Sequence, residues 1–239
     1  MKSIFHPSTE RGHVDFGWLN SHHSFSFGHW YSPDKVHFGA LRVLNDDIVT
    51  GGQGFGAHPH DNMEIVSIPL SGALAHKDST GTDGIIKTGD VQIMSAGSGI
   101  RHSEFNASKT DPVNFLQIWV FPKENNIKPR YEQKTFDSAD RQNKWQVVVS
   151  PLKEDGGVWI NQDSRFSIAE LDPETSISYT PAFNGNGVYF FMIGGEAEVG
   201  GRTLNERDAI GIWETETIEL KSNNKAKVLA IEVPMPENG

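Results

Sequence analysis

Two stretches decide the fold: Gly-Phe-Gly-Ala-His-Pro-His at residues 54–60 and Met-Ser-Ala-Gly-Ser-Gly-Ile-Arg-His-Ser-Glu at residues 94–104. Side chains of a β-strand alternate between its two faces, so His58 and His60 share a face, and so do His102 and Glu104. Two such pairs on facing strands aim four ligand groups at one point and leave open positions around it. Imidazole and carboxylate groups suit divalent transition metals. The two stretches therefore predict a mononuclear metal site between β-strands.

The rest of the chain is also typical of β-structure. Glycine and Asp/Asn turn signals separate short runs rich in Val, Ile and aromatic residues, as in sandwiches and barrels. The clearest runs are Glu64–Leu70, Val91–Met94, Asn114–Phe121, Gln146–Ser150, Val188–Ile193 and Lys227–Val233. No segment shows a long helical period, and only residues 138–144 are expected to form a short helix. We expect an all-β protein.

A weak internal repeat predicts two barrels of the same kind. Gly72 and Gly195 each begin a hairpin, and Asp90 and Asp208 occupy related later positions in the two halves. The polar stretch 123–136 is the best linker candidate. We therefore expect two jelly-roll β-barrels in tandem, residues 1–135 with the metal site and residues 136–239 without it. Because all ten histidines lie at or before position 102, the second barrel is expected to be structural or to cover the first.

Composition excludes several classes of function. The chain has 21 Lys+Arg against 31 Asp+Glu, a formal net charge of −10. Since no Lys/Arg cluster could neutralise phosphate groups, neither direct nucleic-acid binding nor membrane anchoring is expected. The absence of cysteine excludes disulfides, thiolate nucleophiles, zinc fingers and iron–sulfur clusters. There is no apolar run of signal-peptide or membrane-spanning length, and this predicts a cytoplasmic protein.

The spacing of glycines around the two histidine pairs resembles the two motifs of the cupin superfamily, and the details resemble the pirin family. The likeness is carried by the two quoted stretches, together with Arg-Gly-His at residues 11–13 and Ser-Phe-Ser-Phe at residues 24–27. It is dense over residues 10–136 and looser from there to the C-terminus. Within that family the chain looks most similar to bacterial pirin-like proteins with quercetin 2,3-dioxygenase activity. The resemblance implies a bicupin fold.

The resemblance also implies a set of metal ligands, which falls on His58, His60, His102 and Glu104. In many cupins the glutamate of the first motif is a ligand, and here Glu64 occupies that place. Pirins use the carboxylate two residues after the last histidine instead, so Glu104 is the expected ligand and Glu64 the alternative. We expect one divalent transition metal ion, Fe(II) first, with Zn, Ni, Mn, Co and Cu as the other compatible ions.

Three neutral imidazoles and one carboxylate leave a divalent centre with a net positive charge, which favours an anionic oxygen ligand such as a deprotonated enol. Flavonols such as quercetin carry a hydroxyl beside a carbonyl and meet this demand. The resemblance implies that dioxygen opens the flavonol ring with release of carbon monoxide. Glu104 would then be catalytic as well, as the general base for the substrate proton. The expected partners are thus a small aromatic substrate and dioxygen.

Two other classes of function stay open. One is a non-enzymatic, redox-responsive regulatory protein that holds the metal and acts through a protein partner, as the pirin resemblance also allows. The other is a cupin of isomerase or storage type, which would need several Arg or Lys side chains near the metal. The two motif stretches contain only Arg101, which a strand would point away from His102. The other histidines are interpreted as structural; His76, after Gly72, is expected to be exposed.

Overall fold

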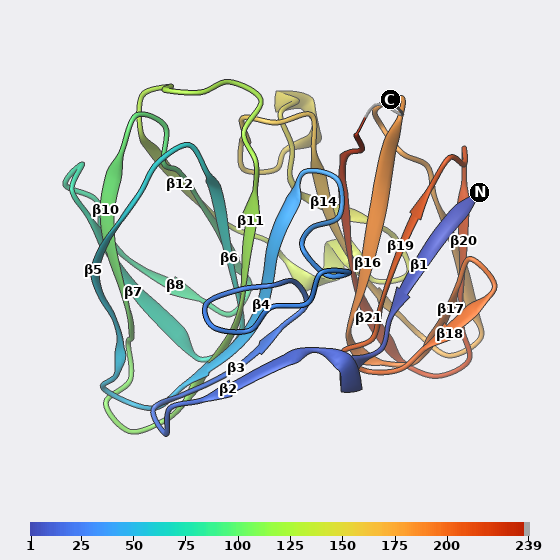
Figure 1. Ribbon diagram of the computed structural model, residues 1–239. Helices are drawn as coiled ribbons and strands as arrows, with labels where there is room; N and C mark the ends of the chain where they lie inside the picture. The colour runs from blue at the N-terminus through green and yellow to red at the C-terminus, as the bar shows by residue number, and fades with distance from the viewer. Residues whose placement is uncertain (237–239) are drawn as a thin grey trace.

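The computed structural model describes residues 1–236, which are almost entirely β-structure. Two β-barrels lie side by side, and each consists of one large and one small antiparallel sheet (Figure 1). The expected all-β fold of two tandem barrels is confirmed. Residues 1–236 contain no helix that is long and apolar enough to cross a membrane.

The first barrel is built from a seven-stranded and a four-stranded sheet. The large sheet has the order β12 (Arg130–Thr135), β9 (Asp90–Ser95), β6 (Glu64–Ser71), β11 (Val113–Val120), β4 (Leu41–Val49), β3 (Leu19–His23) and β2 (Gly12–Asp15). The small sheet has the order β5 (Gly54–His60), β10 (Ile100–Asn106), β7 (Ala73–Asp78) and β8 (Asp83–Lys87).

The second barrel repeats this plan with a six-stranded and a four-stranded sheet. The large sheet has the order β1 (Lys2–His6), β19 (Ala209–Trp213), β16 (Asn186–Gly195), β21 (Ala226–Pro234), β14 (Arg165–Leu171) and β13 (Gln146–Val149). The small sheet has the order β15 (Thr175–Tyr179), β20 (Ile218–Ser222), β17 (Ala197–Val199) and β18 (Arg202–Leu204). Three short 3-10 helices complete the described chain: η1 (Ser8–Glu10), η2 (Ser138–Arg141) and η3 (Lys153–Asp155).

The six runs predicted as strands all form strands, and the short helix predicted at residues 138–144 is η2. The linker prediction is wrong for its second part. Residues 130–135 form β12, which pairs with β9 along its whole length, so irregular chain is confined to the residues before Arg130. The polar character of β12 misled the prediction, because this edge strand is only partly buried.

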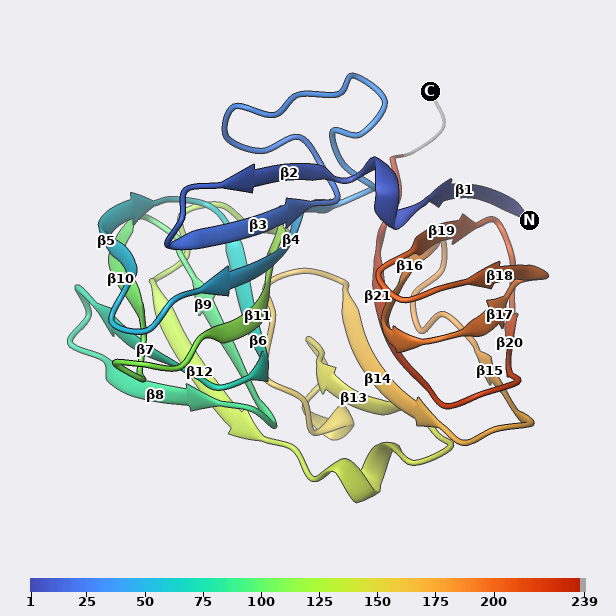
Figure 2. The same cartoon turned by 90° about the horizontal axis from the view of Figure 1, so that it is seen from below.

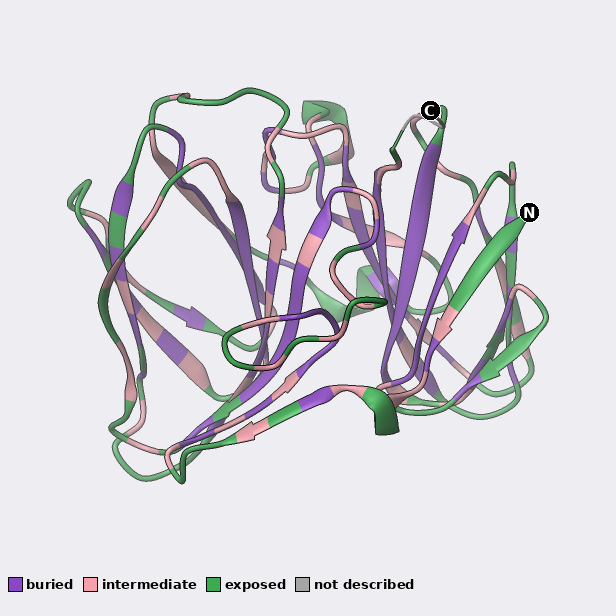
Figure 3. Cartoon of the chain, in the orientation of Figure 1, coloured by how far each residue is buried: buried purple, intermediate pink, exposed green. Residues whose placement is uncertain are grey.

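Strand β1 joins the N-terminus to the second barrel rather than to the first. It pairs with β19 from Lys2, opposite Trp213, to His6, opposite Ala209. The first three residues of β1 are exposed, as expected of an edge strand (Figure 3). The division of the chain into residues 1–135 and 136–239 stays a proposal, and β1 is the segment that crosses between the two halves.

The main apolar core lies where the two large sheets face each other (Figure 2). In β6, Val66 and Ile68 point into this core, while Ile65 belongs to a separate cluster on the other face, as strand alternation requires. Phe191 and Ile231 enter the same core from the second barrel. Burying each such side chain contributes roughly 1.5–3 kcal/mol, so the two barrels are held together as one packed unit.

The hairpins of the predicted repeat depend on glycine. Gly72 and Gly195 follow β6 and end β16, and their φ angles are +77° and +76°. Residues other than glycine rarely adopt this left-handed backbone conformation. A Cβ atom at position 195 would also overlap the carbonyl group of Lys225. Each glycine therefore allows the tight turn that leads from the large sheet into the small one.

The interiors of the two barrels differ in polarity. The second barrel contains a large apolar cluster that includes Phe190, Met192 and Leu220. The first barrel has a smaller apolar cluster around Leu74 and Phe115, and polar side chains are buried with it. These buried polar residues include Asp47, Ser67, Gln92 and Glu104. The second barrel also buries a polar side chain, Glu232, but its carboxylate accepts hydrogen bonds from Tyr179 and Asn186, as buried polar groups require.

Candidate metal centre

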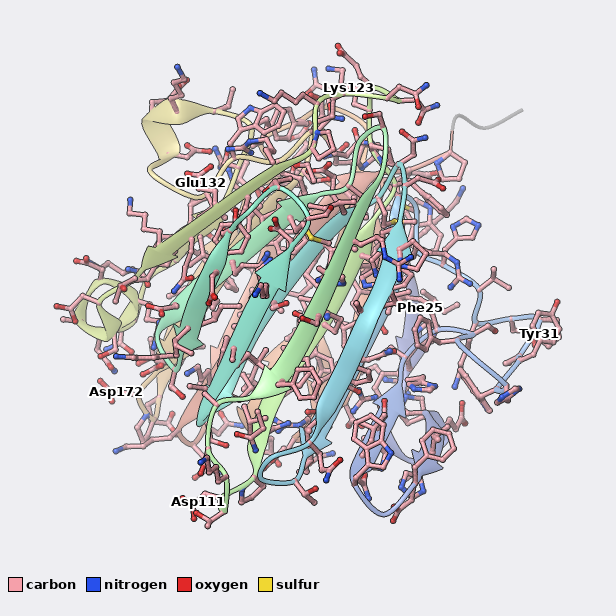
Figure 4. The ribbon with its side chains drawn as sticks, turned by 90° about the vertical axis from the view of Figure 1, so that its left-hand side faces the viewer. Phe25, Tyr31, Asp111, Lys123, Glu132 and Asp172 are labelled. Carbon is pink, nitrogen blue, oxygen red and sulfur yellow. The ribbon has the colours of Figure 1, made fainter. Side chains whose placement is uncertain are left out.

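Strands β5 and β10 bring the two predicted histidine pairs together. They pair antiparallel, with His102 directly opposite His58 and Ile100 opposite His60. Ring centroids are separated by 4.5 Å between His58 and His102 and by 4.9 Å between His60 and His102. One ring nitrogen from each of the three lies within 4.8 Å of the others. Figure 4 looks onto the small sheet that carries them, with β5, β10, β7 and β8 side by side.

Burial keeps two of these imidazoles, those of His60 and His102, in the neutral form that binds metals. It lowers the pKa of His60 to about 4, with a further contribution from the neighbouring His58. Burial, followed by the charges of His58 and His60, lowers the pKa of His102 to about 3. A metal ion needs the free lone pair of a neutral imidazole. At neutral pH, His60 and His102 therefore offer that lone pair.

The surroundings of His58 and His102 fit a divalent transition metal ion. His58 donates from Nδ1 to the carbonyl oxygen of Gly56 across 2.8 Å, which leaves Nε2 free and fixes the ring, as for many metal-ligating histidines. His102 is 2% exposed, and neither of its ring nitrogens has a hydrogen-bond partner among the described residues. Buried polar atoms rarely lack a partner. A metal ion that accepts the lone pair of a ring nitrogen would provide the missing partner of His102.

Glu104 lies on the inner side of this cluster. A bulge in the pairing of β10 with β5 follows His102, so that Glu104 stands opposite Phe55 on β5 and opposite His76 on β7. Its carboxylate accepts from Nε2 of Gln117 across 2.6 Å and lies 3.0 Å from the hydroxyl of Ser67. Burial raises the pKa of this carboxyl group. A carboxylate oxygen of Glu104 falls in a second group of potential ligand atoms, with His76 and His102.

Glu64, the alternative ligand, lies outside both groups of potential ligands. Its Oε2 accepts from the hydroxyl of Ser95 across 2.8 Å and from the backbone N–H of Asn161, in the second half of the chain, across 3.1 Å. Burial raises its pKa to about 7. The side chain that corresponds to a common cupin ligand thus connects the two barrels here.

The position of His76 differs from the one predicted from the sequence. It is 1% exposed, so the expectation of an exposed hairpin residue is wrong. Strand β7 lies between β10 and β8, and its alternation turns His76 into the barrel, where its ring centroid is 4.7 Å from that of Tyr131. His76 donates from Nε2 to Asp78 across 2.9 Å. The sequence did contain a signal, since His76 and Asp78 are themselves two residues apart on a strand.

Other residues around the cluster were also missed. Ser67 and Gln117 hold the Glu104 carboxylate, and each is a polar residue in the middle of an apolar strand, a signal that the sequence offered. Trp119 packs edge-on against His60 at 4.9 Å and provides an aromatic wall. Arg101 is exposed and donates to the carbonyl oxygen of Ala57.

Two barrels of this kind, one of them with a cluster of inward-facing histidines, define the bicupin class of metal proteins. Residues 5–120 match the family model described as Pirin, and residues 147–233 match the model described as Quercetinase C-terminal cupin domain. The chain is 41% identical over 228 residues to a quercetin 2,3-dioxygenase of Escherichia coli K12, which covers 95% of this chain and 96% of that relative. The chain belongs to the pirin family.

Solved structures agree with this assignment. The crystal structure of YhhW from Escherichia coli superposes with a TM-score of 0.94 at 37% identity and covers 100% of both chains. The complex of the bacterial pirin YhhW with nickel(II) gives a TM-score of 0.92 at 37% identity, over 98% of this chain and 100% of that one. These relatives, with the histidine cluster, support a single divalent metal ion as the cofactor.

Proposed function

We propose that this protein is a metal-dependent dioxygenase that cleaves flavonols such as quercetin and releases carbon monoxide. The observation that carries the proposal is the cluster of His58, His60 and His102 at one end of the first barrel. Relatives named quercetin 2,3-dioxygenase and the nickel(II) complex of a bacterial pirin support it. Residues 1–135 would form the catalytic domain and residues 136–239 its structural support.

His58, His60, His102 and Glu104 would hold one divalent ion, with Fe(II) as our first choice and Ni, Zn, Mn, Co and Cu as the alternatives. The bound ion would lower the pKa of a flavonol hydroxyl and hold the resulting anion beside dioxygen. Three neutral imidazoles and one carboxylate leave the positive charge that such an anion requires.

The protein would move the proton and orient the substrate. Glu104 would accept the proton of the flavonol hydroxyl, because burial raises the pKa of its carboxyl group and so makes it a better base. Gln117 and Ser67 hold this carboxylate in place. The edge-on contact of Trp119 with His60 gives an aromatic surface next to the ligand cluster, against which a flat ring system can pack.

The test is to purify the protein anaerobically, measure its metal content, and then add quercetin and oxygen. We expect one divalent ion per chain, loss of quercetin absorbance, and carbon monoxide trapped by reduced haemoglobin. Metal binding without turnover and without any change of the metal spectrum by quercetin would sink the dioxygenase proposal. That result would favour the regulatory alternative, in which the metal-loaded protein binds a protein partner.

A further inference from the structure

The side chain of His76 is held as metal-ligating histidines are held. Its Nε2 donates to Oδ2 of Asp78 across 2.9 Å. Asp78 is itself fixed, because its other oxygen accepts from the backbone N–H of Thr80 across 2.8 Å and from the hydroxyl of the same residue across 2.6 Å. A histidine ligand usually donates its second ring N–H to such a carboxylate, which sets the tautomer and the ring orientation. The lone pair of His76 is therefore on Nδ1.

That lone pair has no partner. Nδ1 of His76 is buried without a hydrogen bond among the described residues, and the side chain is 0% exposed. Nothing in the proposed dioxygenase reaction uses it. A buried acceptor without a donor costs free energy, so this nitrogen is suited to bind a hydrogen-bond donor or a metal ion.

His76 belongs to a second group of ligand atoms with His102 and Glu104, all buried and all within 4.8 Å of one another. The pairing of the strands explains this, because Glu104 stands opposite His76 and His102 stands opposite Asp78. The ring centroids of His76 and His102 are 5.5 Å apart. Both ring nitrogens of His102 are unpartnered, and its ring lies between the outer histidines and His76.

We infer that the first barrel contains a second, inner coordination position for a divalent transition metal ion, formed by His76, His102 and Glu104. Two imidazole nitrogens and a carboxylate oxygen are a donor set for zinc, cobalt, nickel or iron. We call the position at His58, His60 and His102 the outer position. Since His102 and Glu104 take part in both proposed ligand sets, a single ion occupies one position at a time.

The two positions differ in access. His58 and His60 are only partly buried, whereas His76, His102 and Glu104 are all buried. An ion in the outer position has room for a substrate and dioxygen, and an ion in the inner position is enclosed by protein. The inner position therefore retains the metal in a form that does not turn over substrate. This inference rests on the proposed metal centre but not on the proposed reaction.

Cobalt(II) tests the inference, since its visible spectrum reports the ligands. The variant His58→Ala/His60→Ala removes the outer position and leaves the inner one complete. We expect it to bind one cobalt(II) ion with affinity reduced about 10–100-fold, and with a spectrum different from that of the wild type. Adding His76→Ala should reduce the affinity at least 100-fold further, and adding Asp78→Asn about 10–100-fold, as loss of a carboxylate behind a histidine ligand does. The exposed His29→Ala is the matched control and should change nothing.

The outcomes separate the two proposals. A folded His58→Ala/His60→Ala variant that binds no cobalt(II), or whose affinity is unchanged by His76→Ala, overturns the inner position and leaves the outer one standing. If the wild type binds one cobalt(II) ion and the His58→Ala/His60→Ala variant still binds it through His76, but the wild type never cleaves quercetin, only the dioxygenase proposal is overturned. Circular dichroism of every variant shows whether it is folded, and His58→Gln/His60→Gln, which conserves side-chain volume, replaces the Ala variant if that one is not.

Discussion

Gln117 on β11 donates from Nε2 to Oε2 of Glu104 on β10 across 2.6 Å. The bond joins the large and the small sheet of the first barrel, with Glu104 buried and Gln117 partly buried. Hydrogen bonds to a charged group are about twice as strong as those between neutral groups. The hydrogen bond from Gln117 therefore fixes the orientation of the Glu104 carboxylate, which is a ligand in both proposed coordination positions.

Glu104→Gln should weaken metal binding by at least 100-fold, because the amide that replaces the carboxylate is a neutral and weaker ligand. Glu64→Gln is the matched change on the other buried glutamate, and we expect it to leave the metal affinity within threefold of the wild type, since Glu64 binds Ser95 and Asn161. Titration with cobalt(II) measures both. Equal losses in the two variants would contradict the assignment of Glu104 as the ligand.

His60→Ala should lower quercetin turnover by more than 100-fold. The substitution removes a ligand of the outer position and leaves the chain folded, because His60 is only partly buried. Oxygen consumption and carbon monoxide release measure the effect at a saturating metal concentration. His29→Ala, on an exposed loop, should retain full activity, and a His60→Ala enzyme as active as this control would show that His60 is not a ligand.

Asp47 should make the protein less stable as the pH rises. Burial raises its pKa from 3.8 to about 7, so the folded state binds a proton that the unfolded state has already lost above pH 4. The stability from this proton is complete below the unfolded pKa and is lost as the pH rises through 7, at about 1.4 kcal/mol per pKa unit. Asp47→Asn should therefore be more stable than the wild type at pH 8, by a few kcal/mol.

Urea unfolding at pH 5 and pH 8 measures this difference. His6 and His23, whose pKa values burial lowers to about 4, act in the opposite sense between pH 4 and 6.5. They are present in both proteins and cancel in the comparison. Asp83→Asn on the exposed side of β8 should show no pH-dependent gain. An equal gain of Asp47→Asn over the wild type at both pH values would contradict the predicted protonation.

Asp46 should stabilise the contact between the barrels. It accepts from Nε of Arg207, in the second half, across 2.7 Å, and lies 3.5 Å from the buried Arg11. Asp46→Asn leaves the Arg11 guanidinium without its counter-charge and leaves Arg207 only the exposed Glu206, 3.7 Å away, and the loss of one partner of a buried ion pair costs about 3–5 kcal/mol. We expect an unfolding free energy lower by about 3 kcal/mol in urea, against no change for the exposed Asp34→Asn. A loss below 0.5 kcal/mol would refute the role of this carboxylate.

Much of the architecture could be predicted from the sequence, because the signals involved are local. Runs rich in Val, Ile and aromatic residues marked strands such as 64–70 and 188–193, and glycines marked the hairpins at positions 72 and 195, where the structure has positive φ angles. The absence of histidine after position 102 already confined any histidine cluster to the first barrel. The edge strand β12 was missed because its residues are polar and its burial is partial.

The i, i+2 spacing of His58 with His60 and of His102 with Glu104 by itself determined which residues share a face of a strand, since alternation is a property of each strand alone. The tertiary structure decided which strands pair and in what register. The bulge after His102 and the place of β7 beside β10 put Glu104 against His76, and the contact between barrels turned Glu64 toward Asn161. Such pairings form between residues far apart in the chain, and no local pattern of residues specifies them.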